Sequence, residues 1–137
     1  LRQLSFGYLD MAWHTLTEPF KGDIESFENN AWKKTQILPI VKGTCMSTNF
    51  NHLFSGGYAA GYYSYKWSEL LDADAFSVFK AAQKGKKGTI FDKKAAKLFR
   101  ENILEKGGTE KAMDLYKKFR GAEPTIDALL ERDGIKK

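Results

Sequence analysis

Apolar residues recur at spacings of three and four along most of the chain, which is the spacing typical of helices. The pattern predicts a first helix over residues 1–18 and a second over residues 23–38, ended by Pro19 and Pro39. Further helices are predicted over residues 58–83, 92–106, 109–120 and 124–133. No run of alternating apolar residues is long enough to indicate a sheet. The sequence therefore predicts an all-α fold, a helical array without internal repeats.

Residues that favour helix ends stand at the borders of these segments. Asp23, Asp92 and Thr109 are predicted N-caps, because a short side-chain oxygen can accept a hydrogen bond from the free amides of the first turn. Gly121 is predicted to end its helix, since glycine readily adopts the left-handed conformation found just after a helix. These signals fix four expected helix ends, on three of the predicted helices.

Residues 41–61 follow neither the helical nor the strand period and are predicted to form a long loop. Loops of this length inside compact domains are usually functional or disordered. Gly56, Gly57 and Gly61 give it backbone freedom and room for another group to approach closely. The spacing matches neither a dinucleotide-binding fingerprint nor a Walker phosphate loop. We therefore expect a flexible loop over a cleft.

Three tyrosines follow this loop. On a helix that begins near Tyr58, the side chains of Tyr58, Tyr62 and Tyr65 would lie along one face. A phenol has a pKa of about 10, so at neutral pH it is an O–H donor that can stabilise a developing oxyanion. His52 lies upstream and can add a donor. The alternative is that the tyrosines are core residues with hydroxyls at the surface, and spacing alone leaves both open.

The chain has 137 residues, of which 42% are hydrophobic, enough for one domain with a real core. The single cysteine, Cys45, excludes an internal disulfide and is predicted to be a small buried thiol. His14 is predicted to be buried and hydrogen-bonded; a metal shared with Glu18 one turn later would need two further ligands. His14 and His52 alone cannot form a three-ligand zinc site. Without carboxylates or another chain to complete such a site, the chain by itself is a poor candidate for a metalloenzyme.

The formal net charge is +5, and the basic residues are unevenly distributed. A cluster comprises Lys80, Lys84, Lys86, Lys87, Lys93, Lys94, Lys97 and Arg100. It could make the protein a non-enzymatic helical module for an acidic partner, including nucleic acid. The interleaved Phe91 and Phe99 are assigned to the core, so a solvated helix face without nucleic acid is favoured. The uncharged stretch 43–65 is too polar to cross a membrane.

Residues 52–67, HLFSGGYAAGYYSYKW, strongly resemble the tyrosine- and glycine-rich loop of the thimet oligopeptidase family of zinc metallopeptidases. The remaining quoted segments resemble the family in the family's order: LDMAWH at 9–14, LDADAF at 71–76, ILEKGG at 103–108, and FRGAEP at 119–124. Essentially the whole chain is covered. Within the family, Ala122 favours the peptidyl-dipeptidases over the oligopeptidases.

The resemblance implies a two-lobed helical peptidase that hydrolyses short peptides at a zinc ion. The family's His-Glu-x-x-His motif and downstream glutamate are absent from these 137 residues. The chain also begins with helical periodicity at Leu1, without a cap. We therefore expect a C-terminal portion that lacks the zinc lobe, packs against that remainder, is inactive alone and contains no zinc. The compartment expected from the resemblance is bacterial cytoplasm or periplasm.

The resemblance also implies roles for individual residues. Tyr65 would be the principal donor to the oxyanion, and His52 would contact substrate or intermediate. Tyr58 would contact the substrate backbone, with Tyr62 as a further candidate. Gly56, Gly57 and Gly61 would form the substrate-binding loop and let it close over bound peptide.

Overall fold

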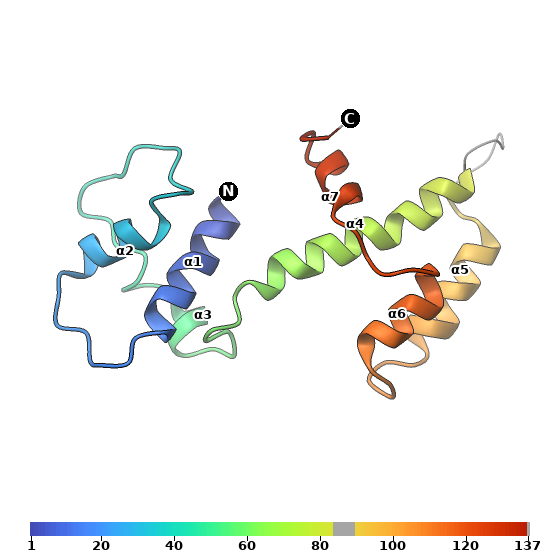
Figure 1. Ribbon diagram of the computed structural model, residues 1–137, viewed down its shortest axis with the longest axis horizontal. Coiled ribbons are helices and arrows are strands. Elements are labelled where there is room, and N and C mark those ends of the chain that lie inside the picture. Colours follow the sequence, from blue (N-terminus) through green and yellow to red (C-terminus); the bar gives the residue numbers. More distant parts are fainter. Residues whose placement is uncertain (84–89, 137) are drawn as a thin grey trace. The chain divides into compact units, whose positions relative to one another are not determined.

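A computed structural model describes residues 1–83 and 90–136, and these residues form helices and connections without any strand (Figure 1). The α-helices are α1 (Arg2–His14), α2 (Ile24–Trp32), α3 (Asn51–Phe54), α4 (Ser64–Gln83), α5 (Lys93–Phe99), α6 (Ala112–Arg120) and α7 (Asp127–Arg132). A short π-helix, η1 (Arg100–Leu104), continues α5. The predicted all-α fold is confirmed for the described residues.

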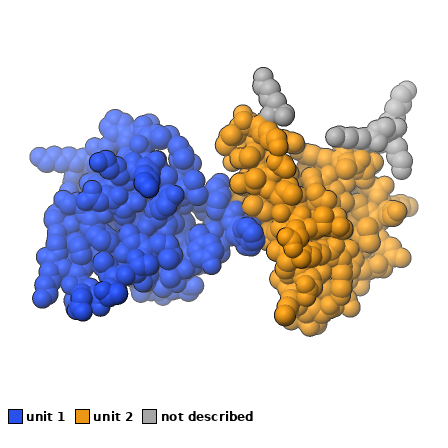
Figure 2. Space-filling model, in the orientation of Figure 1, with its two compact units in different colours: residues 1–67 blue, residues 68–137 orange. Residues whose placement is uncertain are grey.

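The chain divides into two compact units, Leu1–Trp67 and Ser68–Lys137 (Figure 2). The first contains α1, α2, α3 and the first turn of α4, and the second contains the rest of α4 and the later helices. None of the described helices is long and apolar enough to cross a membrane.

The core of the first unit forms where α1 meets the segment around α3. Phe6 and Leu9 of α1 are buried against Phe50 and Leu53, and the rings of Phe6 and Phe50 meet edge to face with centroids 5.0 Å apart. Edge-to-face contacts of this kind add to the free energy of burying the rings. The core therefore fixes α3 against α1, although more than 30 residues of sequence separate them.

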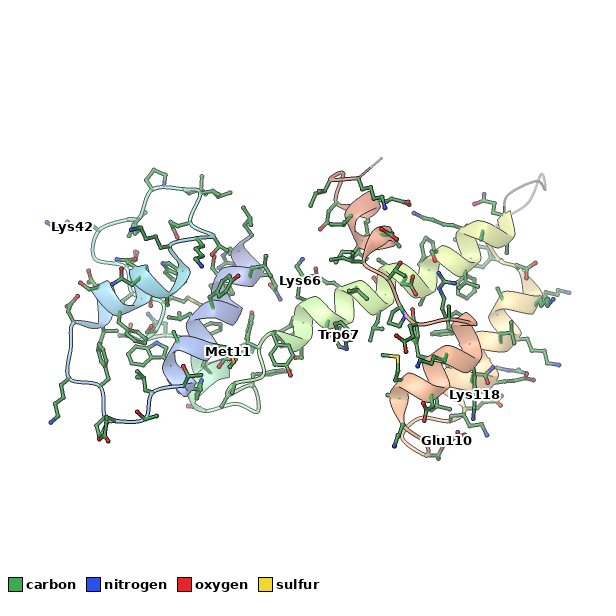
Figure 3. All side chains as sticks on the ribbon, viewed as in Figure 1. Met11, Lys42, Lys66, Trp67, Glu110 and Lys118 are labelled. Atoms are coloured by element: carbon green, nitrogen blue, oxygen red, sulfur yellow. The ribbon has the colours of Figure 1, made fainter. Side chains whose placement is uncertain are left out.

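The second unit is built around α6, where Leu115, Tyr116 and Phe119 are buried. Asp74 of α4, 1% exposed, accepts hydrogen bonds from the Tyr116 hydroxyl at 2.6 Å and from Arg120 Nε at 3.0 Å. Exposed ion pairs lie at the periphery, such as Lys118 Nζ to Glu110 Oε2 at 2.5 Å (Figure 3). A buried carboxylate with two donors thus ties α4 to α6.

The capping signals were correct at three of four positions. Asp23 accepts a hydrogen bond from the Ser26 amide, and Asp92 accepts one from the Ala95 amide. Gly121 has a φ of 79° in the left-handed region and ends α6. The prediction of Thr109 as an N-cap was wrong. Lys111 is the N-cap of α6, and the Thr109 hydroxyl donates instead to the Lys106 carbonyl oxygen.

Most helices are shorter than the periodicity predicted. The first helix ends at His14 rather than at residue 18, since the Thr15 amide and hydroxyl both close on the Met11 carbonyl. The second ends at Trp32 rather than at 38, where Thr35 and Gln36 turn back onto the Trp32 carbonyl. The segment 92–106 is helical to Leu104, but its last turn is π-helical.

The largest difference is at α4, which begins at Ser64 and not near Tyr58. Residues 58–63, called the tyrosine turn below, form consecutive turns. Within them Ala60 has a φ of 53°, and this left-handed conformation interrupts a right-handed helix. The interpretation of three tyrosines on one helix face was therefore wrong. The predicted loop 41–61 also contains the short helix α3.

The basic cluster predicted between residues 80 and 100 is described only in part. Lys84, Lys86 and Lys87 lie outside the described residues. Lys80 lies over the Phe76 ring, and Lys97 and Arg100 pair with Glu101 and Glu105. The described part of the cluster is thus partly neutralised by its own acidic neighbours.

Candidate functional site

His52, Tyr58, Tyr62 and Tyr65 form one cluster of rings in the first unit, which we call the aromatic cluster. Tyr58 stacks on Tyr65 with centroids 5.2 Å apart, and Tyr62 lies 4.9 Å from Tyr65. The His52 ring is 5.6 Å from Tyr58 and 6.4 Å from Tyr62. The three phenols are half-buried and His52 is exposed. The fold therefore brings all four polar side chains singled out in the sequence to one place.

Three different elements position these side chains. His52 lies on α3, Tyr58 and Tyr62 lie in the tyrosine turn, and Tyr65 lies in the first turn of α4. Trp67, 50% exposed, projects from that same first turn (Figure 3). The cluster is thus assembled by a turn and two helix ends.

The two stacked tyrosines also interact through their hydroxyls. A side-chain hydrogen bond with Tyr58 raises the pKa of Tyr65, and burial and the neighbouring phenols raise it further. A raised phenol pKa means that the O–H form persists to a higher pH than in a free tyrosine. Tyr65 is therefore a hydrogen-bond donor throughout the neutral range.

Tyr62 connects the cluster to the core. Its ring lies 5.1 Å from Phe50 and 5.7 Å from Phe6, in both cases edge to face. Burial raises the pKa of Tyr62, and the charge of Arg2 opposes this increase. The ring of Tyr62 therefore packs against the core, which is one of the two interpretations that spacing left open.

The carboxylate of Asp10 holds the tyrosine turn. Asp10 lies on α1 and is completely buried. Its Oδ1 accepts a hydrogen bond from the Ala60 amide at 2.9 Å, and its Oδ2 accepts one from the Tyr62 amide at 2.8 Å. The Nδ1 of His14 lies 2.7 Å from Oδ1. A buried carboxylate needs such donors to offset its lost hydration. Amides bound to Asp10 cannot join a helix, which explains why α4 starts late.

A second buried carboxylate, Glu28 of α2, holds the start of the preceding loop. It is 3% exposed and accepts the Met46 amide at 2.9 Å and the Ser47 amide and hydroxyl at 2.6 Å each. The Cys45 thiol lies 3.7 Å from the same carboxylate. Trp13 Nε1 donates to the Ser47 hydroxyl at 3.0 Å. The predicted buried thiol is thus half-buried beside an anion.

The three glycines differ in what surrounds them. A Cβ on Gly56 would lie 3.1 Å from the His52 carbonyl oxygen, whereas one on Gly57 would meet nothing within 4 Å. A Cβ on Gly61 would make ordinary contacts from 3.6 Å. None of these three has a positive φ. Of the three glycines, only Gly56 is tightly packed, because it lets the chain pass close to the candidate residue His52.

The described residues do not fit a self-contained zinc site. In residues 1–83 and 90–136 no three His, Cys, Asp or Glu side chains gather in a way that could hold a metal ion. His14, a candidate for a metal shared with Glu18, is hydrogen-bonded to Asp10 and half-buried, as a structural histidine would be.

The comparison with known families covers almost the whole chain. Residues 1–135 match the sequence profile described as Peptidase family M3. The chain belongs to peptidase family M3. The match confirms the family resemblance drawn from the glycine- and tyrosine-rich segment and its neighbours.

Individual M3 relatives carry peptidase names. The chain is 44% identical to Oligopeptidase A of Escherichia coli (strain K12) over 137 residues, 99% of this chain and 19% of that protein. It is 40% identical to the probable cytosolic oligopeptidase A of Arabidopsis thaliana, covering 98% of this chain and 19% of the relative. Dipeptidyl carboxypeptidase of Escherichia coli (strain K12) is 37% identical to this chain, and the match covers 96% of this chain and 19% of that protein. The chain thus spans about a fifth of the length of these curated relatives.

The identities run against the hint from Ala122, since the oligopeptidase A sequences are more similar to this M3 chain than the dipeptidyl carboxypeptidase is. Sequence reasoning also missed Asp10 as a site-forming residue, and it missed Glu28 as a buried acceptor for loop amides outside the aromatic cluster. A buried carboxylate on an apolar helix face is the signal that could have found Asp10, because such a group needs donors from elsewhere in the fold.

Proposed function

We propose that this chain supplies substrate- and transition-state-binding side chains of a zinc-dependent M3 peptidase that hydrolyses short peptides. In this proposal the zinc ligands, including the His-Glu-x-x-His motif, lie outside this sequence, and the chain alone does not hydrolyse peptides. The family membership and the peptidase names of the relatives support the peptidase class.

The observation that carries the proposal is the convergence of the aromatic cluster. One imidazole and three phenols, all capable of donating hydrogen bonds, are joined by a continuous series of ring contacts at the surface of the first unit. A peptide carbonyl that is being attacked develops negative charge on its oxygen, and donors fixed beforehand stabilise that charge most effectively.

Within the cluster we assign different roles by exposure and bonding. Tyr65 is the principal oxyanion donor; like any phenol its hydroxyl is protonated at neutral pH, and its raised pKa extends the protonated form to higher pH. His52, which is exposed, contacts substrate or intermediate. Tyr58 contacts the substrate backbone, Tyr62 is a further candidate for substrate contact, and Gly56, Gly57 and Gly61 form the substrate-binding loop.

Specificity and compartment are part of the same proposal. The higher identity to oligopeptidase A favours oligopeptidase over dipeptidyl specificity. Between cytoplasm and periplasm, the plant relative named as cytosolic favours the cytoplasm. The remaining partner is the zinc-binding remainder of the same polypeptide.

The test replaces Tyr65 by Phe in the complete peptidase. Loss of one oxyanion donor commonly costs about 10²–10³-fold in kcat, with a much smaller change in KM. Tyr63→Phe is the matched control, because Tyr63 is in the same segment, is 62% exposed and is not a member of the aromatic cluster. An unchanged kcat in Tyr65→Phe would reduce Tyr65 to a packing residue.

A further inference from the structure

We propose that Asp10 is the positioning residue of the aromatic cluster, acting on catalysis through the backbone of the tyrosine turn without touching substrate. The proposal rests on the function proposed above. It concerns the turn between Tyr58 and Tyr65, whose conformation decides where three of the four candidate side chains point.

The geometry is that of a two-armed clamp. Oδ1 of Asp10 binds the amide of Ala60, and Oδ2 binds the amide of Tyr62. Ala60 lies 50 positions after Asp10 in the chain, and Tyr62 lies 52 positions after it. Tyr62 is itself a cluster residue, and Ala60 stands midway between Tyr58 and Tyr62. The clamp thus fixes the backbone at and between two ring-bearing positions.

The clamped backbone would not take this form by local preference. Ala60 has a φ of 53°, a backbone conformation that residues other than glycine rarely adopt. Its amide is satisfied by Asp10 in this conformation. Without that acceptor the turn is free to relax towards a right-handed conformation and extend α4, which would redirect Tyr58 and Tyr62.

The ability of both Asp10 oxygens to accept hydrogen bonds matters as well as the size of the side chain. Both oxygens of Asp10 accept hydrogen bonds, and Nδ1 of His14 makes a third contact to the carboxylate, at Oδ1. An asparagine of the same size has one oxygen and one NH₂ group, so one arm would present a donor to a donor. Asp10→Asn therefore keeps the packing but opens one arm of the clamp.

Glu28 offers a matched control in the same unit. It is also a buried helical carboxylate that accepts two loop amides, but those amides belong to Met46 and Ser47, outside the aromatic cluster. Glu28→Gln should lower stability in the way that Asp10→Asn does. Only Asp10→Asn should alter the tyrosine turn.

The experiment compares Asp10→Asn, Glu28→Gln and Tyr65→Phe in the complete peptidase by Tm, steady-state kinetics and hydrogen exchange of the 58–63 segment. We expect both carboxylate variants to lower Tm. Asp10→Asn alone should speed amide exchange in the tyrosine turn and lower kcat by about 10-fold to 100-fold, as displaced catalytic groups do. Glu28→Gln should keep kcat within about twofold, since the amides that Glu28 holds belong to Met46 and Ser47 and not to the tyrosine turn.

The outcomes separate the two proposals. If Tyr65→Phe lowers kcat but Asp10→Asn only lowers Tm, the positioning role is wrong and the proposed function stands. If Tyr65→Phe leaves kcat unchanged, the proposed function fails first.

Should Asp10→Asn fail to fold, two measurements still decide. In the unsubstituted enzyme the Ala60 and Tyr62 amides should be protected from exchange, and rapid exchange there would overturn the proposal. His14→Ala, which removes one donor from Asp10, should speed exchange in the turn and lower kcat several-fold. An effect on neither quantity would contradict it.

Discussion

Tyr58 and Tyr65 stack with ring centroids 5.2 Å apart although one lies in a turn and the other in the first turn of a helix. Their separation of seven residues would place them on one face of a continuous helix. The stack is instead produced by a turn that a distant carboxylate holds. The pair therefore depends on tertiary structure, and its chemistry can be altered from either ring.

Tyr58→Phe should lower the pKa of Tyr65, because the hydrogen bond with Tyr58 is the largest cause of the increase. A raised pKa means that the Tyr65 O–H persists as pH rises beyond the ordinary value of about 10. The variant should therefore lose peptidase activity at a lower alkaline pH than the unsubstituted enzyme. A pH profile of kcat and tyrosinate absorbance would measure this. Tyr63→Phe is the control, and an identical alkaline limb in all three proteins would contradict the prediction.

Gly56→Ala and Gly57→Ala should differ although the positions are adjacent. The new Cβ at 56 would lie 3.1 Å from the His52 carbonyl oxygen, so the backbone at His52 must give by a few tenths of an ångström. We expect lower kcat/KM and a lower Tm. At 57 nothing lies within 4 Å, and the reduced entropy of the unfolded chain should add about 0.4–1 kcal/mol of stability if alanine fits the backbone. Thermal unfolding and kinetics of both variants test this, and equal effects would contradict it.

Tyr116→Phe should destabilise the second unit by about 1–3 kcal/mol at neutral pH, because buried Asp74 loses a hydrogen-bond donor. Burial and the Asp74 carboxylate raise the pKa of Tyr116. The unfolded chain therefore ionises first, so the stabilising contribution is complete below about pH 10 and declines as pH rises through the folded-state pKa. Denaturant unfolding of both proteins should show a constant difference from pH 7 to about 9 that narrows above 10. A difference that widens there would contradict the assignment.

The sequence predicted what local chemistry decides. Three capping residues bond within one helical turn of their own position: Asp23, Asp92 and Gly121. Their roles could therefore be predicted from the neighbouring sequence alone. The start of α4 was mispredicted because the acceptor that holds the Tyr62 amide, Asp10, lies 52 residues away. Periodicity contains no information about such a partner.

The aromatic cluster was predicted in membership but not in construction. Family resemblance and donor chemistry selected His52, Tyr58, Tyr62 and Tyr65, and these rings do lie together. Whether they act on a peptide remains the proposal tested above. The tight packing at Gly56 but not at Gly57 could not be predicted, because it depends on how the chain passes His52.

The Asp10 clamp has a consequence for how this region acquires its shape. Because the clamp joins α1 to amides about 50 residues later, a large loop must close before the turn has its acceptor. The tyrosine arrangement should then be among the later features to form as the unit folds. Residues 52–67 grafted into another protein would therefore not keep this conformation unless that protein supplied a carboxylate to accept hydrogen bonds from the turn.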